Sequence, residues 1–155
     1  MDSPRQTVTL SSTAWTTIAG HASSAFPEEC CGVLVGLSAP ASFTVHSAHP
    51  CPNRAPQSRH NSFLIDPDDI LVIRRLARDS GLDLIGFYHS HPNARAYFSP
   101  RDLRQCWPGY PNLVVSVPNG QPPTAKAFLA GSDLTHAAEI PVTIAPLPAP
   151  DTILL

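Results

Sequence analysis

Two histidines and an aspartate in one short segment have the types and spacing of metal ligands. His89 and His91 lie two residues apart in the run GFYHSHP, at the end of an apolar stretch that predicts a strand. Alternate side chains of a strand point to the same face, so both imidazoles face the same way. Asp102 follows in the first turn of a short helix that is predicted to begin at Ser99. Two imidazoles and one carboxylate predict one zinc ion per chain, with the fourth position left open for water.

This open zinc position predicts a hydrolase that cleaves peptide-type bonds. Zinc lowers the pKa of bound water from 15.7 to about 7, which supplies hydroxide at neutral pH. A general base must accept a proton from the water and return it to the leaving amine. Glu28 and Glu29 are the candidates, because they directly precede an apolar segment, 31–36, whose predicted strand can lie beside the histidine strand. The residues alone do not separate the two glutamates.

Each part of this constellation also has a simpler structural interpretation. Two histidines on a strand can be unrelated, and a glutamate before a strand is usually solvated. The run from Ser99 to Asp102 forms a helix capping box on sequence grounds, with Pro100 in the first turn. The combination favours chemistry, and the cap is compatible with it, because a capped first turn fixes the direction of the Asp102 carboxylate.

The surrounding elements predict an α/β domain built on a mixed sheet. Strands are predicted at 6–10, 31–36, 42–49, 62–65, 82–89, 113–117, 125–129 and 142–144. One helix is predicted to start after Ser11 or Ser12 and to end before Pro27. No repeat or linker divides residues 1–145, so we expect a single catalytic domain, followed by a proline-rich tail at 146–155.

A second helix is predicted between Asp66 and Gly81. Asp66 is its expected cap, Asp69 is placed to complete a capping box, and Gly81 ends it. Its expected buried face consists of four apolar residues: Ile70, Ile73, Leu76 and Ala77.

Composition excludes several classes of function. The chain has 155 residues, 43% of them apolar, and a net charge of -2, which gives no reason to expect nucleic acid. No apolar stretch approaches the length of a membrane span, and the N-terminus lacks the pattern of a signal peptide, so we expect a soluble, cytoplasmic protein. The four cysteines fit free thiols better than two disulfides, because nothing indicates export.

The motif residues resemble the JAMM metalloproteases, also called the MPN+ or Mov34/Pad1 family, and in particular its small stand-alone prokaryotic members. That family has a glutamate, then H-[ST]-H-P, seven residues and S-x-x-D. His89-Ser90-His91-Pro92 and Ser99-Pro100-Arg101-Asp102 match this pattern at every fixed position. The glutamate of the family lies three residues before a glycine, so Gly32 selects Glu29 over Glu28.

The resemblance implies a role for each matching residue. His89, His91 and Asp102 correspond to the zinc ligands, Glu29 to the general acid/base, and Ser99 to the serine that stabilises the oxyanion. The implied fold is the α/β sandwich of the family, a mixed sheet between helices that is similar to the cytidine deaminase architecture. The implied substrate is a ubiquitin-like or sulfur-carrier protein, cleaved after its C-terminal Gly-Gly. Loops 50–61 and 92–98 are the expected walls of the groove that receives this tail.

Three other functions fit the sequence less well. A zinc nucleoside deaminase needs H-x-E and P-C-x-x-C, which are absent from the sequence. A serine or cysteine hydrolase lacks G-x-S-x-G and an evident partner for any cysteine. The third alternative is a non-catalytic MPN-type scaffold; such relatives typically break the H-x-H pair or the aspartate, whereas both are intact in this sequence.

Overall fold

The computed structural model describes residues 6–119 and 121–147. Their elements are β1 (Thr7–Ser11), α1 (Ser12–Ala25), β2 (Cys31–Ala39), β3 (Ser42–Cys51), α2 (Pro67–Asp79), β4 (Asp83–Pro92), α3 (Pro100–Gln105), β5 (Asn112–Val117), β6 (Thr124–Ala130), β7 (Ala137–Ile140) and β8 (Val142–Ala145). The strands form one sheet in the order β7-β6-β5-β4-β2-β3-β1-β8. Pairs β1/β3, β1/β8 and β4/β5 are parallel and the other pairs are antiparallel. The predicted mixed sheet is confirmed.

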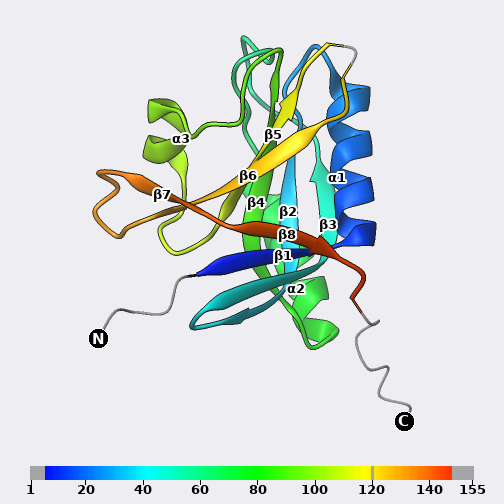
Figure 1. Cartoon of the computed structure of the whole chain (residues 1–155), viewed down its shortest axis with the longest axis vertical. Coiled ribbons are helices and arrows are strands. Elements are labelled where there is room, and N and C mark those ends of the chain that lie inside the picture. Colours follow the sequence, from blue (N-terminus) through cyan, green and yellow to red (C-terminus); the bar gives the residue numbers. More distant parts are fainter. Residues whose placement is uncertain (1–5, 120, 148–155) are drawn as a thin grey trace.

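Helices cover both faces of this sheet (Figure 1). On one face, Ile18 of α1 belongs to a core that includes Leu34 and Tyr88. On the other, Ile73 of α2 packs against a core that includes Phe87. Successive side chains of β4 therefore point to opposite faces, with Tyr88 toward α1 and its neighbours toward α2. The histidines of the motif face the α2 side.

The strand that follows Glu29 lies directly beside the histidine strand. β2 and β4 pair antiparallel, with Cys31 opposite His89 and Gly32 opposite Tyr88. This pairing was expected from the sequence and it carries the glutamate to the end of β4. Cys30 and Cys31, the two residues between Glu29 and Gly32, thus link the candidate base to the sheet.

Gly32 is required by close packing against Tyr88. A Cβ atom at position 32 would overlap the Tyr88 ring, which is fully buried and whose hydroxyl hydrogen-bonds His21 Nδ1 at 2.8 Å. We expect Gly32→Ala to lower the free energy of unfolding by about 1–3 kcal/mol, because the ring has no space to move. Thermal unfolding measures this loss. The control is Gly20→Ala in α1, where no atom lies within 4 Å; it should be neutral or stabilising. Equal behaviour of the two variants would contradict the packing argument.

Four details of the sequence prediction were wrong. Residues 62–65 form no strand, because their backbone bonds the Asn53 side chain instead: Asn53 accepts from Leu64 N at 3.1 Å and donates to Ser62 O at 3.0 Å. The strand β7 was missed; its short segment pairs only with β6 at an edge of the sheet.

The other two errors concern α2. Asp66 caps the helix, because its Oδ1 accepts from Asp68 N at 2.9 Å. Asp69 does not complete a capping box. Leu76 is 61% exposed, since the helical repeat places it roughly 60° from Ile73 on the side away from Ala77, and roughly 100° from Ala77. The predicted C-terminus is confirmed, with Gly81 at a φ of 77°.

Two further expectations concern the whole chain. All four cysteines are free thiols, as predicted. In the described part of the chain no helix combines the length and the apolarity that a membrane span requires. Most of the predicted tail, from residue 148 onward, lies outside the described residues.

Candidate metal centre

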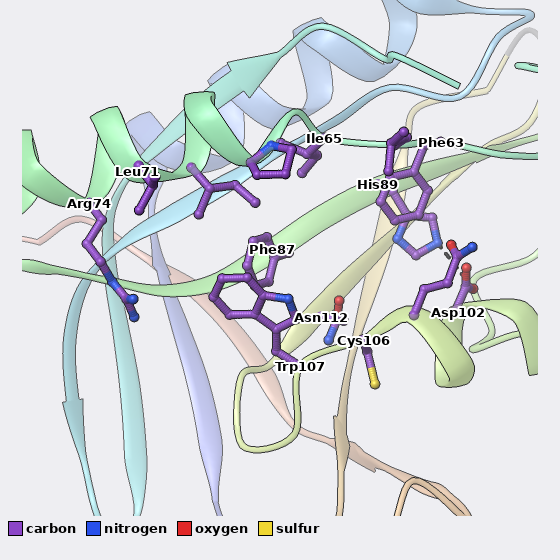
Figure 2. Close-up of a pocket in the computed structure, with 14 residues that line it drawn as sticks. Phe63, Ile65, Leu71, Arg74, Phe87, His89, Asp102, Cys106, Trp107 and Asn112 are labelled. Atoms are coloured by element: carbon purple, nitrogen blue, oxygen red, sulfur yellow. Dashed lines mark ion pairs between the residues drawn. The ribbon is translucent and has the colours of Figure 1, made fainter. Parts of the chain in front are cut away.

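The three predicted ligands converge in a buried cluster. His89 Nε2 lies 3.1 Å from His91 Nε2 and 3.2 Å from Asp102 Oδ2, and His91 Nε2 lies 3.5 Å from the same oxygen. His89, His91 and Asp102 are only 1%, 7% and 8% exposed. One donor atom from each lies within 4.8 Å of the other two. Figure 2 shows His89 at the end of β4 with Asp102 of α3 facing it.

A capping box orients the Asp102 carboxylate. Asp102 N donates to Ser99 Oγ at 3.0 Å, and Ser99 N donates to Asp102 Oδ2 at 3.0 Å. The same Oδ2 atom faces both histidines. The cap predicted from the sequence therefore fixes the direction in which this carboxylate points.

Different contacts hold the two imidazoles. His91 Nδ1 lies 3.2 Å from Arg95 O, which fits an Nδ1–H donor and leaves Nε2 unprotonated. Among the described residues His89 Nδ1 has no hydrogen-bond partner, and its ring stacks on Phe63 with centroids 4.5 Å apart. Aromatic stacking therefore takes over for His89 the orienting role that a hydrogen bond has for His91.

The donor types of the cluster suit a cation, whereas the pKa values of its two histidines shift in opposite directions. Burial lowers the pKa of His89 and favours the neutral imidazole that a metal needs. For His91, burial lowers the pKa but hydrogen bonding to Asp102 outweighs it, so the pKa is raised. Burial raises the pKa of Asp102, and its bonds to His89 and His91 outweigh this, so the carboxyl stays ionised. Two nitrogen donors and one anionic oxygen fit a divalent metal such as zinc.

Glu29 lies in the cleft beside this cluster, whereas Glu28 is exposed on the surface. Its side chain is 6% exposed, and burial raises its pKa to about 7, with His91 lowering it and Asp102 raising it. A carboxyl that titrates near neutral pH can both accept and donate a proton.

The backbone at Glu29 is tied at three points. Glu29 N donates to Arg59 O at 2.7 Å, and Asn53 Nδ2 donates to Glu29 O at 3.1 Å. Cys30 N donates to Ser90 Oγ at 2.8 Å. Sequence reasoning gave Ser90 no role, and the structure places it as the link between the glutamate segment and the histidine strand.

We expect the buried Glu29 carboxyl to make the metal-free protein less stable as the pH rises. Its pKa is raised in the folded state from 4.5 to about 7, so between these values the unfolded chain releases a proton that the folded chain retains. Folding stability therefore falls from about pH 4.5 to pH 7, by about 3 kcal/mol in total.

Denaturant unfolding of chelator-treated wild type and Glu29→Gln measures this loss. The two proteins should be equally stable near pH 4, and the variant should be the more stable above pH 7. A difference that does not change with pH would contradict the raised pKa.

Two clefts meet at the cluster of His89, His91 and Asp102. The first, of about 570 Å³, is mostly apolar; it includes His89 and Asp102 and runs between α2 and α3. Figure 2 shows Leu71 and Arg74 of α2 at a distance from His89, with Trp107 and Phe87 between. The second cleft is polar; it contains Glu29, His91 and Ser99.

The expected groove walls lie on the polar cleft. From loop 50–61, the last two residues, His60 and Asn61, line this cleft. From loop 92–98, the lining residues are Pro92, Ala94 and Tyr97. The apolar cleft was not anticipated from the sequence. The cleft is marked in the structure by apolar side chains that stay exposed next to the site: Leu64, Leu71 and Trp107 are 51%, 63% and 38% exposed.

Comparison with known families agrees with this geometry. Residues 11–130 match Prok-JAB, the prokaryotic homologs of the JAB domain. This chain belongs to that family. The resemblance to JAMM/MPN+ proteins, noted from the H-S-H-P and S-x-x-D motifs, is thereby confirmed.

Solved structures share the JAB fold over nearly the whole chain. A protein of Desulfitobacterium hafniense, determined in solution, has a TM-score of 0.80 and 29% identity, and the match covers 90% of this chain and 94% of that one. A protein of Salinibacter ruber has a TM-score of 0.67 and 29% identity, with 92% and 94% covered. The predicted fold class is confirmed.

Curated relatives match over shorter stretches. A desampylase of Haloferax volcanii is 41% identical over 61% of this chain and 66% of its own length. A probable TtuB-protein conjugate cleaving protease of Thermus thermophilus is 34% identical over 51% and 49%. Tail tip assembly protein K of Escherichia phage N15 is 33% identical over 57% and 32%. The chain thus spans less than two thirds of the length of each of these relatives.

Proposed function

We propose that this JAB-domain chain is a zinc-dependent, cytoplasmic isopeptidase of the JAMM type. Its substrate is a ubiquitin-like or sulfur-carrier protein, cleaved at the amide bond after the C-terminal Gly-Gly. The observation that supports this proposal most strongly is the buried cluster of His89, His91 and Asp102, with Glu29 in the adjoining cleft. Two of the three curated relatives, the desampylase and the probable TtuB-conjugate protease, have names that fit such a substrate.

The roles of the residues follow from their positions. His89, His91 and Asp102 would hold the zinc ion, which would supply a water of lowered pKa. Glu29 accepts a proton from the attacking water and returns it to the leaving amine, for which a pKa of about 7 is suited. Ser99 Oγ already accepts from Asp102 N, so its own hydroxyl proton is available to the developing oxyanion.

The position of Glu29 also sets the direction of the substrate. The acid that protonates the leaving amine must lie on the amine side of the scissile bond. Glu29 lines the polar cleft and is absent from the lining of the apolar one. We infer that the leaving group occupies the polar cleft, whose walls were expected from the sequence to receive the Gly-Gly tail, and that the Gly-Gly-terminated protein instead approaches along the apolar cleft between α2 and α3.

Metal analysis combined with a substrate screen tests this proposal. The purified protein is analysed for metal and then mixed with sulfur-carrier proteins whose Gly-Gly end is joined to a lysine side chain or a further residue. One zinc per chain and release of the carrier, abolished by a chelator and restored by zinc, are expected. A folded protein that takes up no metal and cleaves none of these substrates would instead be a scaffold, and the search would turn to binding partners.

A further inference from the structure

Two arginines of the polar cleft form no ion pair with the described residues. Arg101 and Arg104 are three residues apart on α3, so they share a face of that helix, and both line the cleft. Both side chains are exposed, and neither forms an ion pair with any carboxylate in the described part of the chain. Arg101 Nη1 donates to Asn61 O at 3.3 Å, which fixes one nitrogen and leaves its other donors free.

The charge of this cleft differs from that of the apolar one. Arg74 is the only guanidinium among the described residues that line the apolar cleft, and it already bonds the Tyr110 hydroxyl at 2.7 Å and lies 3.7 Å from Asp83. In the polar cleft the acidic side chains are Glu29 and Asp102, which belong to the reaction centre. The charge of Arg101 acts on Glu29 and partly offsets the rise in its pKa that burial causes. Neither guanidinium is held in an ion pair among the described residues, so both can contact a ligand on the amine side of the scissile bond.

We propose that Arg101 and Arg104 bind a carboxylate carried by the leaving group. This inference rests on the proposed function, because the position of Glu29 assigns the polar cleft to the leaving amine. Guanidinium groups bind carboxylates through several donors in a fixed plane, which favours an acidic group close to the scissile amide. The two arginines are thus specificity-determining residues, separate from those that carry out the reaction.

A carboxylate at this position has two sources. It is the α-carboxylate when the carrier is joined to a single amino acid. It is an acidic side chain when the carrier is joined to a lysine whose neighbours are aspartate or glutamate. The α-carboxylate and the acidic side chain present the same anionic oxygens to α3. The experiment therefore removes one of these two carboxylates at a time.

Paired substrates that differ only in the carboxylate test the proposal. A sulfur-carrier protein with a Gly-Gly end is extended by alanine or by alaninamide, and a second pair has the carrier on a lysine flanked by glutamates or by glutamines. We expect wild type to prefer the anionic member of at least one pair by about tenfold in kcat/KM, as charge-assisted hydrogen bonds at a partly exposed site allow. The pair that shows the preference identifies the source.

Variants then assign the preference to α3. The double variant Arg101→Met/Arg104→Met should reduce this preference, the ratio of kcat/KM for the anionic to the neutral substrate, to about twofold or less. Arg75→Met is the matched control, because Arg75 is an exposed arginine of α2 outside both clefts, and it should retain the preference. Equal cleavage of both members of both pairs by wild type, or a preference that survives the double variant, would overturn the inference while leaving the proposed isopeptidase intact.

A binding measurement decides the case in which no carrier is cleaved. The Nε–Hε signals of Arg101 and Arg104, assigned with the two single variants, are followed by NMR during titration with N-acetylalanine and with N-acetylalaninamide. Shifts caused by the carboxylate alone would support the carboxylate site even if the proposed function failed. No shift with either compound would overturn the site.

Discussion

Glu29→Gln is expected to abolish hydrolysis while the protein keeps its metal. Glutamine has nearly the same size and cannot exchange a proton, so the variant loses the group that moves a proton between water and leaving amine. Loss of a general acid/base costs about 10²–10⁴-fold in kcat. The fold should be unaffected, because the backbone at Glu29 is held by Arg59 and Asn53 whatever the side chain is.

Glu28→Gln is the matched control for this experiment. It removes the same charge from the neighbouring residue, which is exposed and absent from both clefts that meet at the metal cluster. We expect wild-type turnover and wild-type zinc content for Glu28→Gln, and wild-type zinc content without turnover for Glu29→Gln. Substantial activity in Glu29→Gln would remove this residue from the reaction, and the reverse pattern would assign the role to Glu28.

The cluster of His89, His91 and Asp102 was predictable because its geometry is local. His89 and His91 follow from the two-residue repeat of a strand, and Asp102 follows from a cap that the run beginning at Ser99 specifies on its own. Each of these rules acts over a few residues, so the sequence needs no knowledge of the fold to bring the ligands together. The loop between the strand and the helix also had to be long enough to bring Asp102 back to the histidines, and the seven residues between His91 and Ser99 are enough.

The position of Glu29 depends on contacts between distant parts of the chain. The pairing of β2 with β4 joins segments about sixty residues apart, and the bond from Cys30 N to Ser90 Oγ lies within that pairing. The residues alone left Glu28 and Glu29 equivalent, and only the resemblance to a family separated them. In the structure the difference is burial, which follows from tertiary packing.

The least predictable features are those formed by side chains between elements. Asn53 replaces strand pairing for residues 62–65, because one amide group satisfies backbone atoms on both sides of the loop. The apolar cleft requires the angle between α2 and α3, which no periodicity encodes. The composition of the run around Phe63 predicts a strand, but in the structure the Phe63 ring stacks on His89.

Replacing any one ligand is expected to remove both metal and hydrolysis. His89→Ala, His91→Ala and Asp102→Asn each leave two protein donors, and we expect zinc affinity to fall by more than about 100-fold, since even outer contacts of such sites cost about 10–100-fold. Elemental mass spectrometry of the purified proteins measures the bound metal. His136→Ala is the control, because His136 is an exposed histidine outside the cluster and outside the clefts that meet there.

Asp102→Asn separates metal binding from folding. Asparagine keeps the shape of the side chain and an oxygen that can accept from Ser99 N, so α3 should remain capped. It removes the negative charge that attracts the metal. The same charge raises the pKa of His91 in the wild type. A folded Asp102→Asn protein without zinc would therefore assign the loss to the missing charge. A variant that retains one zinc per chain would show that the Asp102 carboxylate is not needed to hold the metal, and Asp102 would leave the ligand set.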